Sequence, residues 1–243
     1  MHASMGAIGT GGAVEGGAAA VIEALQRALG PTGLIAMPGF STDASFPASH
    51  DRAALSAERI AEIEAAVPGH DPANSPTVGM GVIAETFRTW PGTRRSSHPT
   101  VSICLNGPDT ETYLTPHARA WACGPETPLG HLRARPAMKM LLIGVGWNRC
   151  TALHTAETLA TTRRTKVRRF KSGAGNAAWL ETPDVADDLN RLFPGVGAGF
   201  EATGAVRVGK IGAAEARLCP YAALVAYAAE AIDAANRASG DRH

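Results

Sequence analysis

A histidine and a glutamate, His154 and Glu157, stand three residues apart in the segment "TALHTAE". In a helix this spacing puts both side chains on one face, where the carboxylate can hold one ring nitrogen while the other accepts a proton. If the helix begins near Thr151, its N-terminal dipole disfavours imidazolium and keeps the ring able to act as a general base. Such pairs also occur where they only stabilise a helix, so the spacing leaves both interpretations open.

Two further segments have the composition of anion-binding sites. Residues 6–17, "GAIGTGGAVEGG", form a glycine-rich loop whose backbone N–H groups can approach a pyrophosphate. Residues 94–99, "RRSSHP", offer arginine forks and serine hydroxyls. A flexible loop and a solvated basic loop are the alternatives, and the run from Arg163 to Lys171 is expected to form an exposed basic face.

An α/β framework is predicted to position these segments. Residues 138–146, "MKMLLIGVG", are a continuous apolar run typical of a buried strand, and the segment with His154 follows as a helix. A strand, a glycine turn and a helix in this order place functional groups at the carboxyl end of the strand. Other strands are predicted in 33–38, 100–107 and 205–214, and other helices in 18–30, in 77–90 and from about Tyr221 to Ala238. We expect the polar segment 41–76 to lie over one α/β domain.

The composition is that of a globular protein. The 243 residues carry 23 basic and 22 acidic side chains, so no basic excess supports nucleic-acid or membrane-surface binding. Four widely spaced cysteines give neither a zinc motif nor a disulfide framework, and neither a membrane span nor a secretory signal is recognisable. We therefore expect a cytoplasmic protein without a metal, either monomeric or homodimeric.

The order of several motifs resembles one family, the antibiotic N-acetyltransferases, which include the aminoglycoside 3-N-acetyltransferases. The resemblance runs from His2 to about Gly212 and rests on "HASMGAIG", "SPTVGMGVIAETFR", "PGTRRSSHPTVS", "TPLGHL" and "LLIGVGWNRCTALHTAE". It implies a single domain, residues 1–243, with a central mixed sheet flanked by helices, distinct from the other common acetyltransferase fold. The family's helix and strand before the opening histidine are expected to be missing here.

The resemblance also implies acetyl-CoA as cosubstrate and a role for each matching residue. His154 would take a proton from the acceptor amine, Glu157 would orient the ring, and Thr151 would lie near the thioester. Contacts with coenzyme A are expected from Ser4, Met5, Gly6, Ser41, Arg95, Ser96 and His98. Candidate acidic residues for the acceptor are Asp71, Glu85, Asp187 and Asp188, with the role of Glu85 open between substrate binding and structure.

The implied reaction is direct acetyl transfer to an amine, most simply the 3-amino group of an aminoglycoside. It needs no cysteine nucleophile, and its rate should fall at low pH as the amine and His154 become protonated. Three alternatives stay open: an acetyltransferase for a biosynthetic amine, a nucleotide-binding oxidoreductase built on "GAIGTGG", and a non-catalytic protein that binds coenzyme A. The oxidoreductase is disfavoured because no strand precedes its glycine loop.

Overall fold

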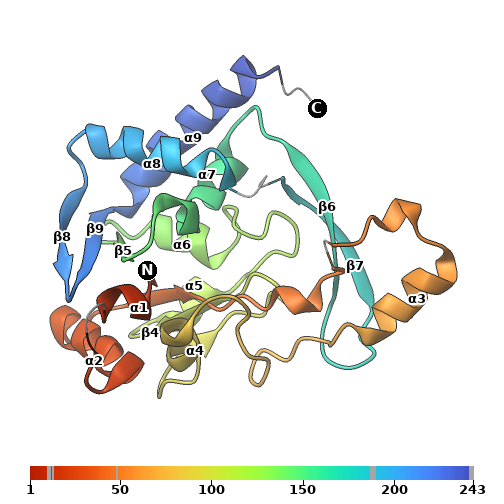
Figure 1. Ribbon diagram of the computed structural model, residues 1–243, viewed down its shortest axis with the longest axis horizontal. Helices are drawn as coiled ribbons and strands as arrows, with labels where there is room; N and C mark the ends of the chain where they lie inside the picture. The colour runs from red at the N-terminus through yellow and green to blue at the C-terminus, as the bar shows by residue number, and fades with distance from the viewer. Residues whose placement is uncertain (10–11, 13, 48, 187–189, 241–243) are drawn as a thin grey trace.

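The chain folds around a four-stranded mixed sheet in the computed structural model, which describes residues 1–9, 12, 14–47, 49–186 and 190–240 (Figure 1). The strands lie in the spatial order β1 (His2–Ala3), β5 (Lys139–Ile143), β9 (Ala214–Pro220) and β8 (Arg207–Ile211). β1 is parallel to β5, and the other pairs are antiparallel. The apolar run predicted as a strand is β5, in which Met140, Leu142 and Ile143 are buried.

A second, antiparallel sheet lies beside the first. Its strands, in spatial order, are β2 (Ile35–Pro38), β4 (Ile103–Asn106) and β3 (Arg94–Arg95). Met37 pairs with Cys104 in the centre of this sheet, and both side chains are buried. The sequence predicted β2 and β4 as strands but gave no indication that they form a sheet separate from β5.

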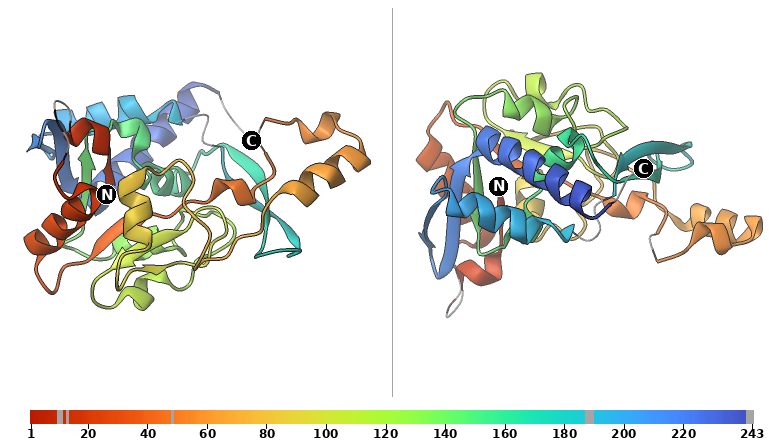
Figure 2. Two further views of the ribbon diagram at one scale, coloured as in Figure 1. Left: turned by 60° about the horizontal axis from the view of Figure 1, so that its bottom comes forward. Right: turned by 90° about the horizontal axis from the view of Figure 1, so that it is seen from above.

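Helices cover the two sheets and complete two apolar clusters. The larger cluster includes α7 (Ala152–Leu159), packed against α9 (Tyr221–Ala238), with α6 (Pro128–Arg133) and α8 (Phe193–Ala202) beside them. Figures 1 and 2 show α8 and α9 side by side on one face of the molecule. The smaller cluster includes α1 (Met5–Ile8), α2 (Gly17–Leu29) and α4 (Val82–Arg88). α5 (Thr110–Leu114) follows β4 and packs on it.

The segment after β2 leaves the body of the molecule. It contains the 3-10 helices η1 (Thr42–Ala44) and η2 (Arg52–Ala54) and then α3 (Ala57–Ala66), which stands at one end beside the hairpin of β6 (Thr165–Lys171) and β7 (Trp179–Val185) (Figure 2). Lys171 Nζ donates to the carbonyl of Val67 at 2.6 Å, and Arg169 pairs with Glu64 at 2.6 Å. The segment is an excursion, as expected, but it stands against a hairpin at one end and does not lie over the domain.

Two local expectations need correction. The predicted helix over 77–90 is shortened to Val82–Arg88, because Gly79 and Gly81 have φ angles of 71° and 84° and interrupt it. The basic run predicted as an exposed face is strand β6, where Lys171 is buried and Arg168 pairs with Asp184 at 2.5 Å. Among the described helices, none has both the length and the apolar character that a membrane span requires.

Candidate active site

His154 and Glu157 lie together on α7, as their spacing predicts. His154 Nδ1 is 2.7 Å from Glu157 Oε2, and the two side chains are 15% and 11% exposed. Because a carboxylate accepts hydrogen bonds, Nδ1 carries the hydrogen and Nε2 is left with a lone pair. The ring also packs edge-on against Phe193, with centroids 4.9 Å apart. The pair thus has the geometry of an oriented general base.

The start of α7 is held by a residue of the N-terminal strand β1. Thr151 is the N-cap, but its own side chain makes no capping hydrogen bond. Its backbone N–H donates instead to Nε2 of His2, in β1, at 3.1 Å. Burial, and then the positive charge of the terminal amine, hold the pKa of His2 well below the ordinary 6.5. His2 is therefore neutral and able to accept this hydrogen bond.

A cavity of about 530 Å³ opens beside His154 and Thr151. It lies at the carboxyl ends of the parallel strands β1 and β5, the edge at which α/β proteins bind ligands. The 3-10 helix η3 (Trp147–Arg149) carries the chain from β5 past this edge into α7. The wall is completed by residues 1–6, Met37, Pro38, Phe40, residues 79–84, Val145, Asn148, Arg149, Cys150 and Asn190.

The sequence and the fold both match one known group of enzymes. The family model for aminoglycoside 3-N-acetyltransferases matches residues 1–233. The chain belongs to this family. The SPbeta prophage-derived aminoglycoside N(3')-acetyltransferase-like protein YokD of Bacillus subtilis is 33% identical over 224 residues, which are 90% of this chain and 79% of YokD.

Solved structures of this acetyltransferase family have the same fold. The crystal structure of YokD matches 95% of this chain and 84% of its own with a TM-score of 0.85 and 32% identity. AAC-IIIb, solved as a binary complex with CoASH, gives a TM-score of 0.81 and 28% identity, with coverage of 96% and 88%. AAC-VIa bound to sisomicin gives 0.79 and 30%, with coverage of 96% and 89%. The predicted family, α/β fold and transferase class are confirmed.

The opening segment of this acetyltransferase lines the same cavity as His154. Ser4, Met5 and Gly6 all line the cavity. Ser4 donates its N–H to the carbonyl of Ile143 at 2.9 Å and accepts from the N–H of Ala7 through its hydroxyl at 3.2 Å. The first of these bonds fixes the segment to β5, and the second caps α1. A backbone that turns sharply at the cavity wall is suited to close contact with a cosubstrate.

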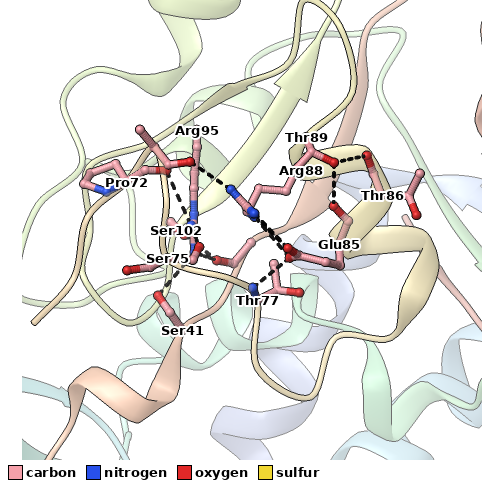
Figure 3. A network of polar contacts seen from close by, with 12 residues as sticks. Ser41, Pro72, Ser75, Thr77, Glu85, Thr86, Arg88, Thr89, Arg95 and Ser102 are labelled. Carbon is pink, nitrogen blue, oxygen red and sulfur yellow. Dashed lines mark hydrogen bonds and ion pairs between the residues drawn. The ribbon is translucent and has the colours of Figure 1, made fainter. Parts of the chain in front are cut away.

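Four other predicted cofactor contacts lie elsewhere. Arg95, from β3, donates Nε to Ser102 at 2.7 Å, and its terminal nitrogens donate to the carbonyls of Gly39 and Ser75 and to the hydroxyl of Ser41 at 3.2 Å (Figure 3). Ser41 is 1% exposed. None of these side chains lines the cavity, so the structure does not support the expected contact of Arg95 and Ser41 with coenzyme A. Their hydrogen bonds tie three loops together.

Ser96 and His98 are also buried, and together with Thr100 and His117 they form a layer of buried polar side chains. His98 accepts at Nδ1 from the N–H groups of Thr100 and Val101, at 3.2 and 3.1 Å. Ser96 donates to Nδ1 of His117 at 2.8 Å. Burial lowers the pKa of His98 to about 3 and that of His117 to about 4. The motif "RSSHP" is thus used inside the protein, and its predicted role in cofactor binding is not supported by its placement.

The described acidic candidates for the acceptor do not reach the cavity. Glu85 pairs with Arg88 at 2.7 Å and accepts from the N–H of Thr77 at 2.8 Å. Partial burial opposes its ionisation, but these hydrogen bonds lower the pKa of Glu85 to about 2. Asp71 accepts from its own turn, at Ala73 and Asn74, which lowers its pKa. Glu85 thus joins helix α4 to the loop at Thr77, and Asp71 stabilises its own turn, while Asp187 and Asp188 lie outside the described residues.

Sequence reasoning did not assign a role to two residues at the site. His2, in β1, accepts the hydrogen bond of the Thr151 N–H, and no local pattern in the sequence indicates this contact. Arg149 lines the cavity next to His2 and His154. No pattern distinguished Arg149, because a single arginine after a glycine turn is ordinary in a surface loop.

Proposed function

We propose that this protein transfers the acetyl group of acetyl-CoA to an amine of an aminoglycoside, at the 3-amino position. The observation that carries the proposal is His154 at the wall of a 530 Å³ cavity, with Glu157 2.7 Å from its Nδ1 and Nε2 left as the proton acceptor. AAC-IIIb with CoASH and AAC-VIa with sisomicin support the two substrates, because this chain shares their fold.

The proposed reaction needs no covalent enzyme intermediate. The amine nitrogen attacks the thioester carbonyl while His154 takes its proton, the carbon–sulfur bond breaks, and the thiolate of coenzyme A receives a proton. Glu157 holds the ring and stabilises its charged form during the transfer. Thr151 would contact the thioester and the segment Ser4–Gly6 the pantetheine or pyrophosphate, which is supported by their place in the cavity wall. Much of the rate gain would come from holding amine and thioester together.

The charges of the cavity wall also allow a second candidate for the acceptor substrate. No described residue of the cavity wall is an aspartate or glutamate, and Arg149 adds a positive charge. Polycationic aminoglycosides favour carboxylates, so an amine with fewer positive charges is the alternative acceptor. Asp187 and Asp188 precede Asn190, which lines the cavity, and remain the candidates for recognition of an aminoglycoside.

The proposal is tested by the release of free thiol from acetyl-CoA with a panel of aminoglycosides. We expect release with 3-amino aminoglycosides, and a loss of about 100- to 10,000-fold in kcat for His154→Ala because the base is removed. His131→Ala is the matched control, since His131 bonds the carbonyl of Tyr113 and does not line the cavity. Release that is equal in wild type and His154→Ala would exclude His154 as the base.

A further inference from the structure

The wall of the cavity beside His154 carries one strongly basic side chain. Among the arginines, lysines, aspartates and glutamates of the described part of the chain, Arg149 alone lines this cavity. Its side chain is exposed, and its guanidinium makes no hydrogen bond or ion pair with a described residue. All five N–H donors of this guanidinium are therefore available to a ligand in the cavity.

The turn that carries Arg149 is held on both sides. Trp147, in η3, is buried, and a Cβ on Gly197 of α8 would come within 2.0 Å of its ring, so the indole lies directly against that helix. The carbonyl of Asn148 accepts from the side-chain amide of Asn190 at 2.8 Å. The guanidinium thus extends from a fixed backbone, which reduces the entropy that is lost when it binds a ligand.

Arg149 lies at the end of the cavity where the reacting groups meet. In the sequence it precedes Thr151, the residue that we place beside the thioester, by two positions. Burial lowers the pKa of His2, and the charge of Arg149 contributes to this effect. The ring of His2 is itself in contact with the N–H of Thr151, at 3.1 Å. The phosphates of coenzyme A lie at the far end of the pantetheine arm from the thioester, so an anion bound by Arg149 belongs to the acceptor amine.

We propose that Arg149 is an anion subsite for the acceptor, so that the amines bound best carry a carboxylate or a phosphate and few positive charges. The inference rests on the proposed function and narrows its acceptor: aminoglycosides remain substrates, but the guanidinium repels their ammonium groups. The planar fork of N–H donors suits either anion, because it can form two parallel hydrogen bonds. His154 still deprotonates the amine, and Arg149 takes no part in the chemical step.

The first experiment compares two amino sugars that differ only in an anion, glucosamine and glucosamine 6-phosphate. Each is titrated by calorimetry into the protein saturated with coenzyme A, so that no transfer occurs. We expect the wild type to bind the phosphate ester at least about tenfold more tightly, because a hydrogen-bonded charge stabilises the complex by that factor. Arg149→Gln should bring the two affinities within about twofold of each other. Equal affinities in the wild type, or an undiminished preference in Arg149→Gln, would overturn the proposal.

The matched control is Arg94→Gln, which also removes one exposed arginine. Arg94 lies in β3 and does not line the cavity, so this variant should keep the preference for the phosphate ester. Arg149→Gln should unfold at the temperature of the wild type, because the guanidinium has no partner among the described residues. An equal loss of preference in both variants would assign the effect to net charge and overturn the subsite.

A second titration, with coenzyme A alone, identifies the substrate that carries the anion. The wild type and Arg149→Gln should bind coenzyme A with affinities that agree within about twofold, since the phosphates lie away from Arg149. A loss of at least about tenfold in Arg149→Gln that disappears with 3′-dephospho-coenzyme A would place Arg149 on the cosubstrate. That result would overturn the acceptor subsite.

The third experiment measures turnover of a 3-amino aminoglycoside. We expect kcat/KM to rise about 2- to 10-fold in Arg149→Gln and further in Arg149→Glu, because a repelling charge is first removed and then reversed. No rise in either variant would overturn the proposal and leave the proposed function intact. Absence of transfer in all three proteins, with the preference for the phosphate ester unchanged, would overturn the proposed function alone.

Discussion

At the scale of single residues, the site depends on which ring nitrogen each histidine uses. His154 donates from Nδ1 to Glu157, which leaves Nε2 as its proton acceptor, whereas His2 accepts at Nε2 from the N–H of Thr151. The two imidazoles therefore have opposite tasks, one chemical and one structural. The sequence predicted the first pair because the helix period links positions 154 and 157. It could not predict the second contact, because His2 and Thr151 are brought together by the pairing of β1 with β5.

His2 is predicted to act as a positioning residue for His154. His2→Phe keeps a ring but removes the acceptor, so the first turn of α7 should shift and kcat should fall about 10- to 100-fold. His2→Gln places an amide oxygen near the position of Nε2 and should restore most of the rate. The measurement is kcat for both variants across pH 6 to 8, with circular dichroism to confirm folding. Equal rates for Phe and Gln would mean that the hydrogen bond does not position the base.

At the scale of elements, strand β3 shows that a motif suited to binding phosphate can instead hold loops together. Its Arg95 offers the same guanidinium donors to a phosphate or to backbone carbonyls, and in this fold the carbonyls of Gly39 and Ser75 take them. The sequence predicted the strands and helices with long apolar patterns, such as β5 and α9. The use of "RSSHP" depends on which loops pack against β3, and this is not encoded locally.

Arg95→Met should therefore reduce stability and leave cofactor binding nearly unchanged. It leaves buried acceptors without donors, which should lower the free energy of unfolding by about 3 kcal/mol. The KM for acetyl-CoA should stay within about twofold of wild type. Arg94→Met is the matched control, because Arg94 precedes it in β3 but is exposed. A large rise in KM with little change in unfolding by denaturant would instead support the role predicted from the motif.

At the scale of the whole molecule, the buried polar layer links stability to pH. His98 and His117 are neutral in the folded protein, with pKa values of about 3 and 4, but the unfolded chain binds protons near 6.5. The unfolded state therefore gains protons first as the pH falls. The contribution of the two neutral rings to the free energy of unfolding is therefore complete above about pH 6.5. It is lost as the pH falls toward 4.

We expect the free energy of unfolding to fall by about 3 kcal/mol per pH unit below pH 6 from these two residues together. Denaturant titrations at pH 7, 6 and 5 would measure the slope. His117→Gln removes one titrating ring while keeping polar atoms, and it should make the slope shallower than that of the wild type. Equal stability of the wild type at pH 7 and 5 would contradict the assignment of neutral buried rings.

The four cysteines, at positions 104, 123, 150 and 219, are all buried. Burial also raises the pKa of the thiols of Cys104 and Cys219 to about 11 and that of Cys150 to about 12, so few thiolates exist to react at neutral pH. A colorimetric thiol reagent added to the native protein would then register coenzyme A and almost nothing else. Once the chain opens, the same reagent would label the protein itself, so one dye can follow turnover and loss of the fold in a single cuvette.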